Sequence, residues 1–166
     1  PVCAPACLNG GTCAAPNECD CTATGYGGRQ CDIFNLSGFT RIAAGSFTMG
    51  SPLNEFGRAT DESPHFVTLT HALWVGVTEV TQKQWRSRMG NNPSGNSGCG
   101  DTCPVENVSW WDAIAYVNAL SNAEGIEQCY TLLGCGGTPG HSDYLCTGLN
   151  FAGLACEGYR LPTEAE

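Results

Sequence analysis

The sequence predicts a small disulfide-rich module followed by a mixed α+β domain that is poor in regular secondary structure. Twelve cysteines fall into two groups, and no cysteine lies between Cys31 and Cys99. After residue 39 the apolar residues first alternate and then recur at helical spacing, while 22 glycines and 9 prolines indicate many loops. We therefore expect a module at 1–33, a linker at 34–38 and a domain at 39–166.

The charge balance argues against two classes of partner. The chain has 7 Lys or Arg against 16 Asp or Glu, a net charge of −9. Nucleic acids and anionic membranes both favour basic surfaces, so neither is expected as a partner. No apolar run reaches the roughly 18 residues of a membrane span, so membrane insertion of this segment is not expected. An even number of cysteines at this density is typical of exported proteins, which predicts a secreted or cell-envelope location.

The first cysteine group belongs to a segment that covalent links must hold together. So short a segment buries too little apolar surface to fold alone. Its stretches "CLNGGTC" and "CDCTATGYGGRQC" resemble an EGF-like module. Only two residues precede the first cysteine, so the calcium-binding form of that module is not expected. The resemblance implies the pairs Cys3–Cys13, Cys7–Cys19 and Cys21–Cys31.

Extended structure is expected over residues 39–80. "FTRIAAGSFTMGS" contains two extended runs around a turn at Ala43-Ala44-Gly45. "LNEFGRATDESP" is polar and rich in turn formers, which predicts a loop. "HFVTLTHALWVGVTEV" alternates over one or two strands. His65 and His71 flank this run and are expected at the surface or at a strand edge.

Two helices follow, each with start and stop signals. Thr81 and Gln84 have the spacing of a capping box and Gly90 is a natural C-terminal stop, which predicts a helix of about eight residues. Ser109 opens a second helix that Gly125 ends.

The second helix is predicted to bury one apolar stripe. We expect Trp110 and Trp111 at its start to pack in the core rather than to form a ligand platform. The stripe comprises Trp110, Ile114, Val117 and Leu120 or Ser121.

The stretch at about 126–158 is rich in cysteine and glycine and has little periodicity. This predicts a long insertion held by disulfides. Six cysteines in this half allow many connectivities. His141 lies among them, so a Cys/His zinc site or a Cys–His nucleophile is an alternative, although the spacings match no standard zinc pattern and an even count disfavours a free thiol. Our interpretation is a local pair Cys99–Cys103 and a nested arrangement of Cys129–Cys156 and Cys135–Cys146.

The sequence ends on "GYRLPTEAE", which carries the signal of a helix start. Thr163 and Glu166 have the spacing of a capping box. Because a helix start lies at the last residues, we expect the sequence to be a fragment of a longer chain.

Four stretches within 39–166 carry a family resemblance. "GSFTMGS", "DESPHFVTLTHALWVGVTEVTQKQW", "CPVENVSWWDAIAYVNALS" and "GYRLPTEAE" resemble, in this order, the formylglycine-generating enzyme or sulfatase-modifying factor family. The resemblance implies a fold related to C-type lectins, of which this chain holds the N-terminal half, with the cysteine-rich insertion as a departure from the family pattern. In enzymes of that family a cysteine pair binds copper and oxidises a sulfatase cysteine to formylglycine.

That copper-binding pair and the family's structural calcium ligands are implied to lie after residue 166. No catalytic, cofactor-binding or metal-binding residue is therefore assigned within this chain. Our first hypothesis is an exported multi-module protein that binds an extracellular protein or glycan, or acts as a scaffold, at the cell surface. The alternative is a copper-dependent oxidase whose catalytic cysteines lie outside this chain, so the sequence leaves enzymatic activity open.

Overall fold

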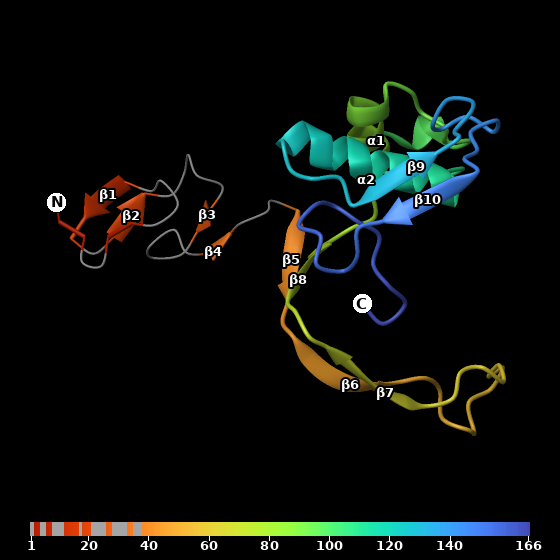
Figure 1. The fold of residues 1–166 in the computed structure, drawn as a ribbon, viewed down its shortest axis with the longest axis horizontal. Coiled ribbons are helices and arrows are strands. Elements are labelled where there is room, and N and C mark those ends of the chain that lie inside the picture. The colour runs from red at the N-terminus through yellow and green to blue at the C-terminus, as the bar shows by residue number, and fades with distance from the viewer. Residues whose placement is uncertain are drawn as a thin grey trace. The chain divides into compact units, whose positions relative to one another are not determined.

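The chain divides into an N-terminal unit, Pro1–Val77, and a C-terminal unit, Thr78–Glu166 (Figure 1). The computed structural model describes residues 2–3, 6–7, 12–16, 18–20, 26–27, 33–34 and 38–166. The expected Cys21–Cys31 pair and most of the linker at 34–38 lie outside these residues. The division falls within the segment that we expected to form one domain. No helix in the described part is long and apolar enough to cross a bilayer.

Two short hairpins begin the N-terminal unit. Strands β1 (Thr12–Ala15) and β2 (Glu18–Asp20) pair antiparallel, with Cys13 opposite Cys19. Strands β3 (Tyr26–Gly27) and β4 (Ile33–Phe34) form the second pair. Disulfides join Cys3 to Cys13 and Cys7 to Cys19. A disulfide-rich N-terminal segment is thus present, and its EGF-like character stays a prediction.

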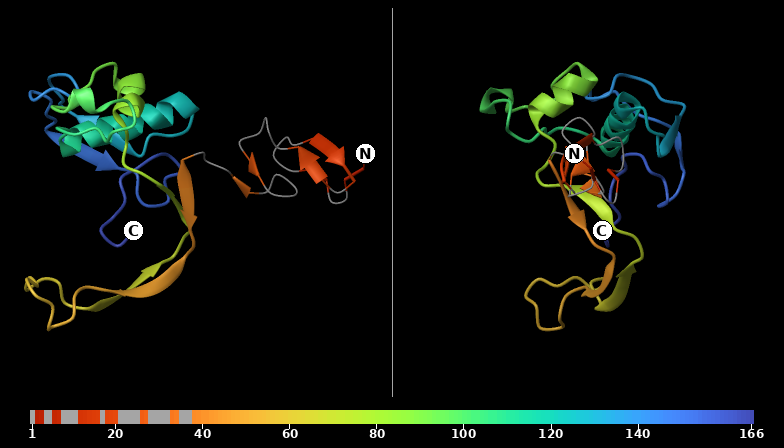
Figure 2. Two further views of the ribbon diagram at one scale, coloured as in Figure 1. Left: turned by 180° about the vertical axis from the view of Figure 1, so that it is seen from behind. Right: turned by 90° about the vertical axis from the view of Figure 1, so that its left-hand side faces the viewer.

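The rest of this unit is a bent two-stranded ribbon, residues 39–76 (Figure 2). Alternating apolar residues predicted its strands, and turn formers predicted the loop at 53–64, which the structure extends to 50–64. Strand β5 pairs with β8 and β6 with β7, all antiparallel, and the bends fall at 43–44 and 70–72. Their bounds are β5 (Phe39–Ile42), β6 (Gly45–Met49), β7 (His65–Leu69) and β8 (Leu73–Gly76).

The ribbon has no core of its own. None of residues 38–77, all of which the structure describes, is buried. Phe66 is 74% exposed and Phe47 is 40% exposed. A two-stranded hairpin is at best marginally stable in water without a third strand or a covering helix. The ribbon therefore needs a further contact to be stable.

Helix α1 (Gln82–Met89) confirms its predicted start and stop. The Thr81 hydroxyl accepts from Gln84 N–H, the Gln84 side chain accepts from Thr81 N–H, and Gly90 closes the helix at φ 78°. Two amides of the first turn donate to the carbonyls of Cys103 and Asp101, 2.8 and 3.1 Å away. A short 3₁₀ helix, Ser97–Cys99, ends at the first cysteine of the Cys99–Cys103 disulfide.

Helix α2 (Trp110–Glu124) also has the predicted caps, Ser109 and Gly125. The prediction for Trp110 was wrong, because this side chain is 52% exposed and meets Trp111 edge to face at 4.9 Å. Trp110 is the first residue of the helix and precedes all of its buried residues. At 100° per residue, Asp112 and Tyr116 lie on one side of the helix and Ile114, Asn118 and Ser121 on the opposite side, so α2 is buried on two sides.

The predicted insertion contains a hairpin that the sequence analysis missed. Strand β9 (Tyr130–Leu133) pairs antiparallel with β10 (Gly148–Phe151), and a bridge between Gly136 and Leu145 continues the register towards the tip. Their sequences, YTLL and GLNF, lie among glycines and cysteines and do not stand out as alternating runs. The segment is also not peripheral, since Cys129 and Tyr130 form the buried cluster of this unit together with Ile114.

Candidate binding surfaces and the disulfide scaffold

All six cysteines of the C-terminal unit form disulfides. The structure joins Cys99 to Cys103, Cys129 to Cys156 and Cys135 to Cys146. No free thiol remains among the described residues. Because a metal ligand or a nucleophile requires a thiolate, this set supplies neither while it is oxidised.

The described part of the chain contains no set of free ligands for the zinc site considered above. Among the described residues, the one group of three potential ligands is Cys3, Cys7 and Cys19, whose sulfurs lie within 4.8 Å of one another, but they belong to two disulfides. His141 is exposed in a turn, where its backbone N–H donates to the carbonyl of Thr138. The structure thus places no thiolate beside His141.

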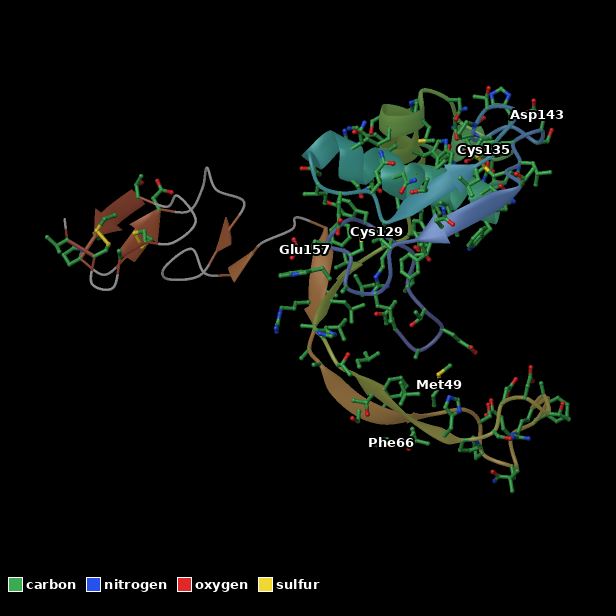
Figure 3. All side chains as sticks on the ribbon, viewed as in Figure 1. Met49, Phe66, Cys129, Cys135, Asp143 and Glu157 are labelled. Atoms are coloured by element: carbon green, nitrogen blue, oxygen red, sulfur yellow. A yellow bond between two sulfur atoms is a disulfide. The ribbon has the colours of Figure 1, made fainter. Side chains whose placement is uncertain are left out.

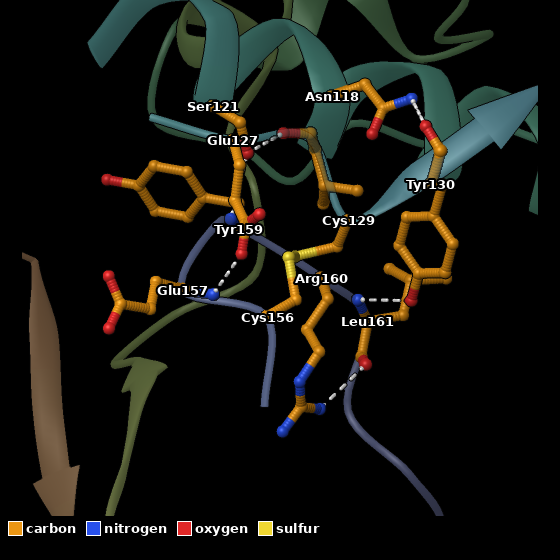
Figure 4. Close-up of a disulfide and its surroundings, with 11 residues drawn as sticks. Asn118, Ser121, Glu127, Cys129, Tyr130, Cys156, Glu157, Tyr159, Arg160 and Leu161 are labelled. Carbon is orange, nitrogen blue, oxygen red and sulfur yellow. Dashed lines mark hydrogen bonds between the residues drawn. A yellow bond between two sulfur atoms is a disulfide. The ribbon is translucent and has the colours of Figure 1, made fainter. Parts of the chain in front are cut away.

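The Cys129–Cys156 disulfide ties the start of β9 to the last segment of the chain (Figure 4). Cys129 is 1% exposed. Past Cys156 the backbone lies so close to Glu127 that a Cβ at Gly158 would overlap the Glu127 carbonyl oxygen. Only glycine fits this approach without a shift of the backbone.

Two hydrogen bonds then fasten the last segment to the helix and the sheet. Tyr159 N–H donates to the Ser121 hydroxyl at 2.9 Å, and Leu161 N–H donates to the Tyr130 hydroxyl at 3.2 Å (Figure 4). Residues 156–161 are therefore held by one covalent and two polar links to the core.

The last residues form the predicted capping box. Thr163 N–H donates to the Glu166 carboxylate at 2.9 Å, and Glu166 N–H donates to the Thr163 hydroxyl at 3.3 Å. The Arg160 guanidinium also binds this carboxylate through two nitrogens, at 2.7 and 2.6 Å. These Arg160 hydrogen bonds are the main reason that the pKa of Glu166 falls to about 2. A charged, oriented carboxylate thus closes residues 160–166 into a rigid turn.

The hairpin tip, residues 137–144, is clamped to both helices. The Asn91 carbonyl oxygen accepts from Trp85 Nε1 at 2.9 Å, and the Asn91 amide donates to the Pro139 carbonyl at 2.7 Å. The Asp112 carboxylate accepts from Gly140 N–H at 2.6 Å. The sequence did not indicate these contacts of Asp112 and Asn91, because Pro139 and Gly140 lie far from them along the chain.

A small apolar pocket of about 100 Å³ lies in the C-terminal unit. Trp85 and Tyr116 stack at 5.2 Å between ring centres, and burial raises the pKa of Tyr116. Ligand pockets usually measure about 300–1,000 Å³ and contain some polar groups, so this one suits a single apolar side chain rather than a cofactor. Its lining is Val80, Trp85, Val105, Val108, Ala113, Tyr116, Val117 and Leu161.

The β6–β7 part of the ribbon presents apolar side chains on both faces. The register pairs Phe47 with Val67 on one face and Thr48 with Phe66 on the other. Met49 and Phe66 accordingly point to opposite sides of the ribbon (Figure 3). Neither strand contains Asp, Glu, Lys or Arg. Phe66, at 74%, is more exposed than Phe47, at 40%.

The loop at 50–64 is held by side-chain hydrogen bonds and is rich in acidic residues. The Ser51 hydroxyl donates to the Glu62 carboxylate at 2.6 Å, and Arg58 Nε donates to the Ser51 carbonyl at 3.1 Å. The Ser51 hydrogen bond is the main reason that the pKa of Glu62 is lowered. Glu55, Asp61 and Glu62 outnumber Arg58, so the loop carries a net negative charge.

Comparison with known proteins places this architecture among described families. The model of the sulfatase-modifying factor enzyme 1-like domain matches residues 29–166. A protein named chaperone protein LppX, from Paenibacillus barcinonensis, is 50% identical over 66 residues, which are 40% of this chain and 22% of that protein.

Two solved structures are also similar. Treponema denticola variable protein 1 has 40% identity and a TM-score of 0.49, over 57% of this chain and 34% of its own. PvdO from Pseudomonas aeruginosa has 27% identity and a TM-score of 0.45, over 57% of this chain and 42% of its own. The chain thus spans well under half the length of each of these relatives.

Proposed function

Since this chain belongs to the family of sulfatase-modifying factor enzyme 1-like domains, we propose that it is part of an exported, multi-module protein and that it acts by binding a partner polypeptide. The observation that supports this proposal most directly is that the ribbon has no buried residue and that Phe47 and Phe66 are exposed on it. Phe47 and Phe66 lie on opposite faces of the ribbon, so each face offers an apolar side chain that a partner polypeptide could cover.

Two further observations support this proposal. The relative that is 50% identical over 66 residues is named a chaperone protein, and chaperones that hold unfolded chains bind apolar segments. The five disulfides among the described residues suit an oxidising compartment outside the cytoplasm. The partner is thus a polypeptide in the cell envelope or outside the cell.

The alternative, a copper-dependent oxidase acting on sulfatases, finds no matching residues in this chain. The resemblance implies a copper-binding cysteine pair after residue 166, and the six cysteines at 99–156 are joined in three disulfides. The residues of this chain therefore neither supply nor exclude that pair, and we derive no oxidative step here. The described part of the chain likewise contains no cluster of three carboxylates that could bind calcium.

Binding can be tested with a permanently unfolded polypeptide. Fluorescein-labelled lactalbumin, reduced and carboxymethylated, is titrated with the 166-residue protein and followed by fluorescence anisotropy. We expect saturable binding in the micromolar range. The native, disulfide-bonded form of the same labelled protein is the control and is expected not to bind. Equal affinity for both forms, or no binding to either, would refute the proposed function.

A further inference from the structure

The hairpin tip, residues 137–144, is joined to the buried side chain of Trp85 through Asn91. The Trp85 indole N–H donates to the Asn91 side-chain oxygen at 2.9 Å, and the amide nitrogen of the same side chain donates to the Pro139 carbonyl at 2.7 Å. Trp85 is 2% exposed, so its N–H would lose its partner if Asn91 turned away, and a buried unpaired donor is costly. One planar amide thus links the position of the tip to the orientation of the indole.

The tip fits closely on the two helices. Gly140 has φ 84°, and a Cβ there would lie 2.7 Å from the side-chain oxygen of Asn91, closer than such atoms approach. The Gly140 N–H donates to the carboxylate of Asp112, a residue that is itself 2% exposed. The tip is therefore seated at two points, on Asn91 just after α1 and on Asp112 in α2.

The tip has little internal structure to hold it in this position. None of residues 137–144, all of which the structure describes, is buried, and turn hydrogen bonds join His141 to Thr138 and Tyr144 to His141. The Cys135–Cys146 disulfide closes the base of the tip with a sequence separation of 11. In the chain-entropy model, closing a loop of this size favours the ordered state about 100-fold. The seating of the tip should therefore depend on the oxidation state of this pair.

We propose that the Cys135–Cys146 pair is a redox-sensitive lock, whose oxidation seats the hairpin tip on Asn91 and so fixes the Trp85 ring against Tyr116. Forming the S–S bond removes two electrons and two protons from the thiols, and a disulfide oxidant that accepts them becomes a pair of thiols. Trp85 and Tyr116 stack and line the apolar pocket, which has this shape only in the oxidised chain. This inference goes beyond the proposed function, because it concerns neither the ribbon nor its partner.

The first test replaces the pair by Cys135→Ser and Cys146→Ser, which models the dithiol form. The readout is the hydrogen-exchange rate of the Trp85 indole N–H, followed by NMR on the 166-residue protein with ¹⁵N-labelled tryptophan and assigned with Trp85→Phe. We expect exchange about tenfold faster in the serine variant, the factor that one hydrogen bond contributes. The matched control is Cys3→Ser with Cys13→Ser, which opens a loop of separation 10 in the N-terminal unit and should change nothing.

The second test asks whether the effect passes through Asn91. Asn91→Asp keeps an oxygen acceptor for the Trp85 N–H but replaces the amide donor with an oxygen that repels the Pro139 carbonyl. In this background the two serine substitutions should produce no further increase in the exchange rate. If the effects of Asn91→Asp and of the serine pair multiply instead, the disulfide does not act on Trp85 through Asn91 and the inference is wrong.

The third test needs no serine variant and therefore decides the question even if that variant does not fold. Coupling between two sites is reciprocal, so releasing the tip from Asn91 must make the disulfide easier to reduce by the same factor. At equilibrium with dithiothreitol, Cys135–Cys146 should be about tenfold more easily reduced in Asn91→Asp than in the unaltered protein. Alkylation and mass spectrometry of the cysteine peptides measure this ratio. An unchanged reduction equilibrium, or unchanged Trp85 exchange in a folded serine variant, would overturn the inference.

Discussion

The Cys129–Cys156 disulfide closes the longest loop among the disulfides that the structure describes, with a sequence separation of 27. Replacing both cysteines with alanine frees the unfolded chain from this constraint. Because the nested Cys135–Cys146 disulfide remains, it shortens the effective loop to roughly 17 residues, and the chain-entropy model gives a loss of about 3 kcal/mol in the free energy of unfolding. Cys129 also lies in the buried cluster, so the smaller alanine side chain adds a packing loss in the same direction.

The matched control removes Cys99 and Cys103, which are separated by four residues. The same model gives a loss of about 1.9 kcal/mol for that loop. Urea denaturation of both double variants, followed by tryptophan fluorescence, measures the two losses. Equal losses, or a larger loss for the short loop, would refute the argument that loop length governs what these disulfides contribute.

Two further predictions concern the last segment of the chain. Because the pKa of Glu166 is about 2 instead of 4.5, the Arg160 pair stabilises the fold fully above about pH 4.5 and loses its effect as the pH falls towards 2. Arg160→Gln should therefore flatten the dependence of the urea midpoint on pH between 2 and 5; an unchanged slope would contradict the assignment. Gly158→Ala should cost about 1–3 kcal/mol, because its Cβ would overlap the backbone of Glu127. Gly98→Ala, where a Cβ would meet nothing within 4 Å, is the control, and equal effects in urea titrations would refute the steric reading.

The helices and the ribbon could be predicted because their signals are local. Thr81 with Gln84, and Ser109 with the residue three positions later, mark helix starts within four residues. The alternation of "HFVTL" likewise marks β7 without reference to any other strand. The family resemblance covered residues 39–166 and the family model matches residues 29–166, so the family of this region was accessible from sequence motifs alone.

The rest depended on contacts between distant residues. Tyr130 pairs with Phe151 across β9 and β10, and the sequence of one strand gives no indication that the other strand is its partner. Asn91 bridges Trp85 and Pro139, and no spacing rule links these positions. The prediction that Trp110 packs in the core was wrong for a different reason. A hydrophobic residue at a helix start favours burial, but its sequence does not show whether another element lies there to cover it.

The nested disulfides have a consequence for how this protein survives proteases. The tip of the β9–β10 hairpin, residues 137–144, contains an exposed turn, the kind of site at which proteases cut. Cys135–Cys146 and Cys129–Cys156 both span that tip. A single cut there would leave the two fragments joined by two covalent bonds. The damaged chain would run as one band on a non-reducing gel and as two after reduction, and its core would remain assembled.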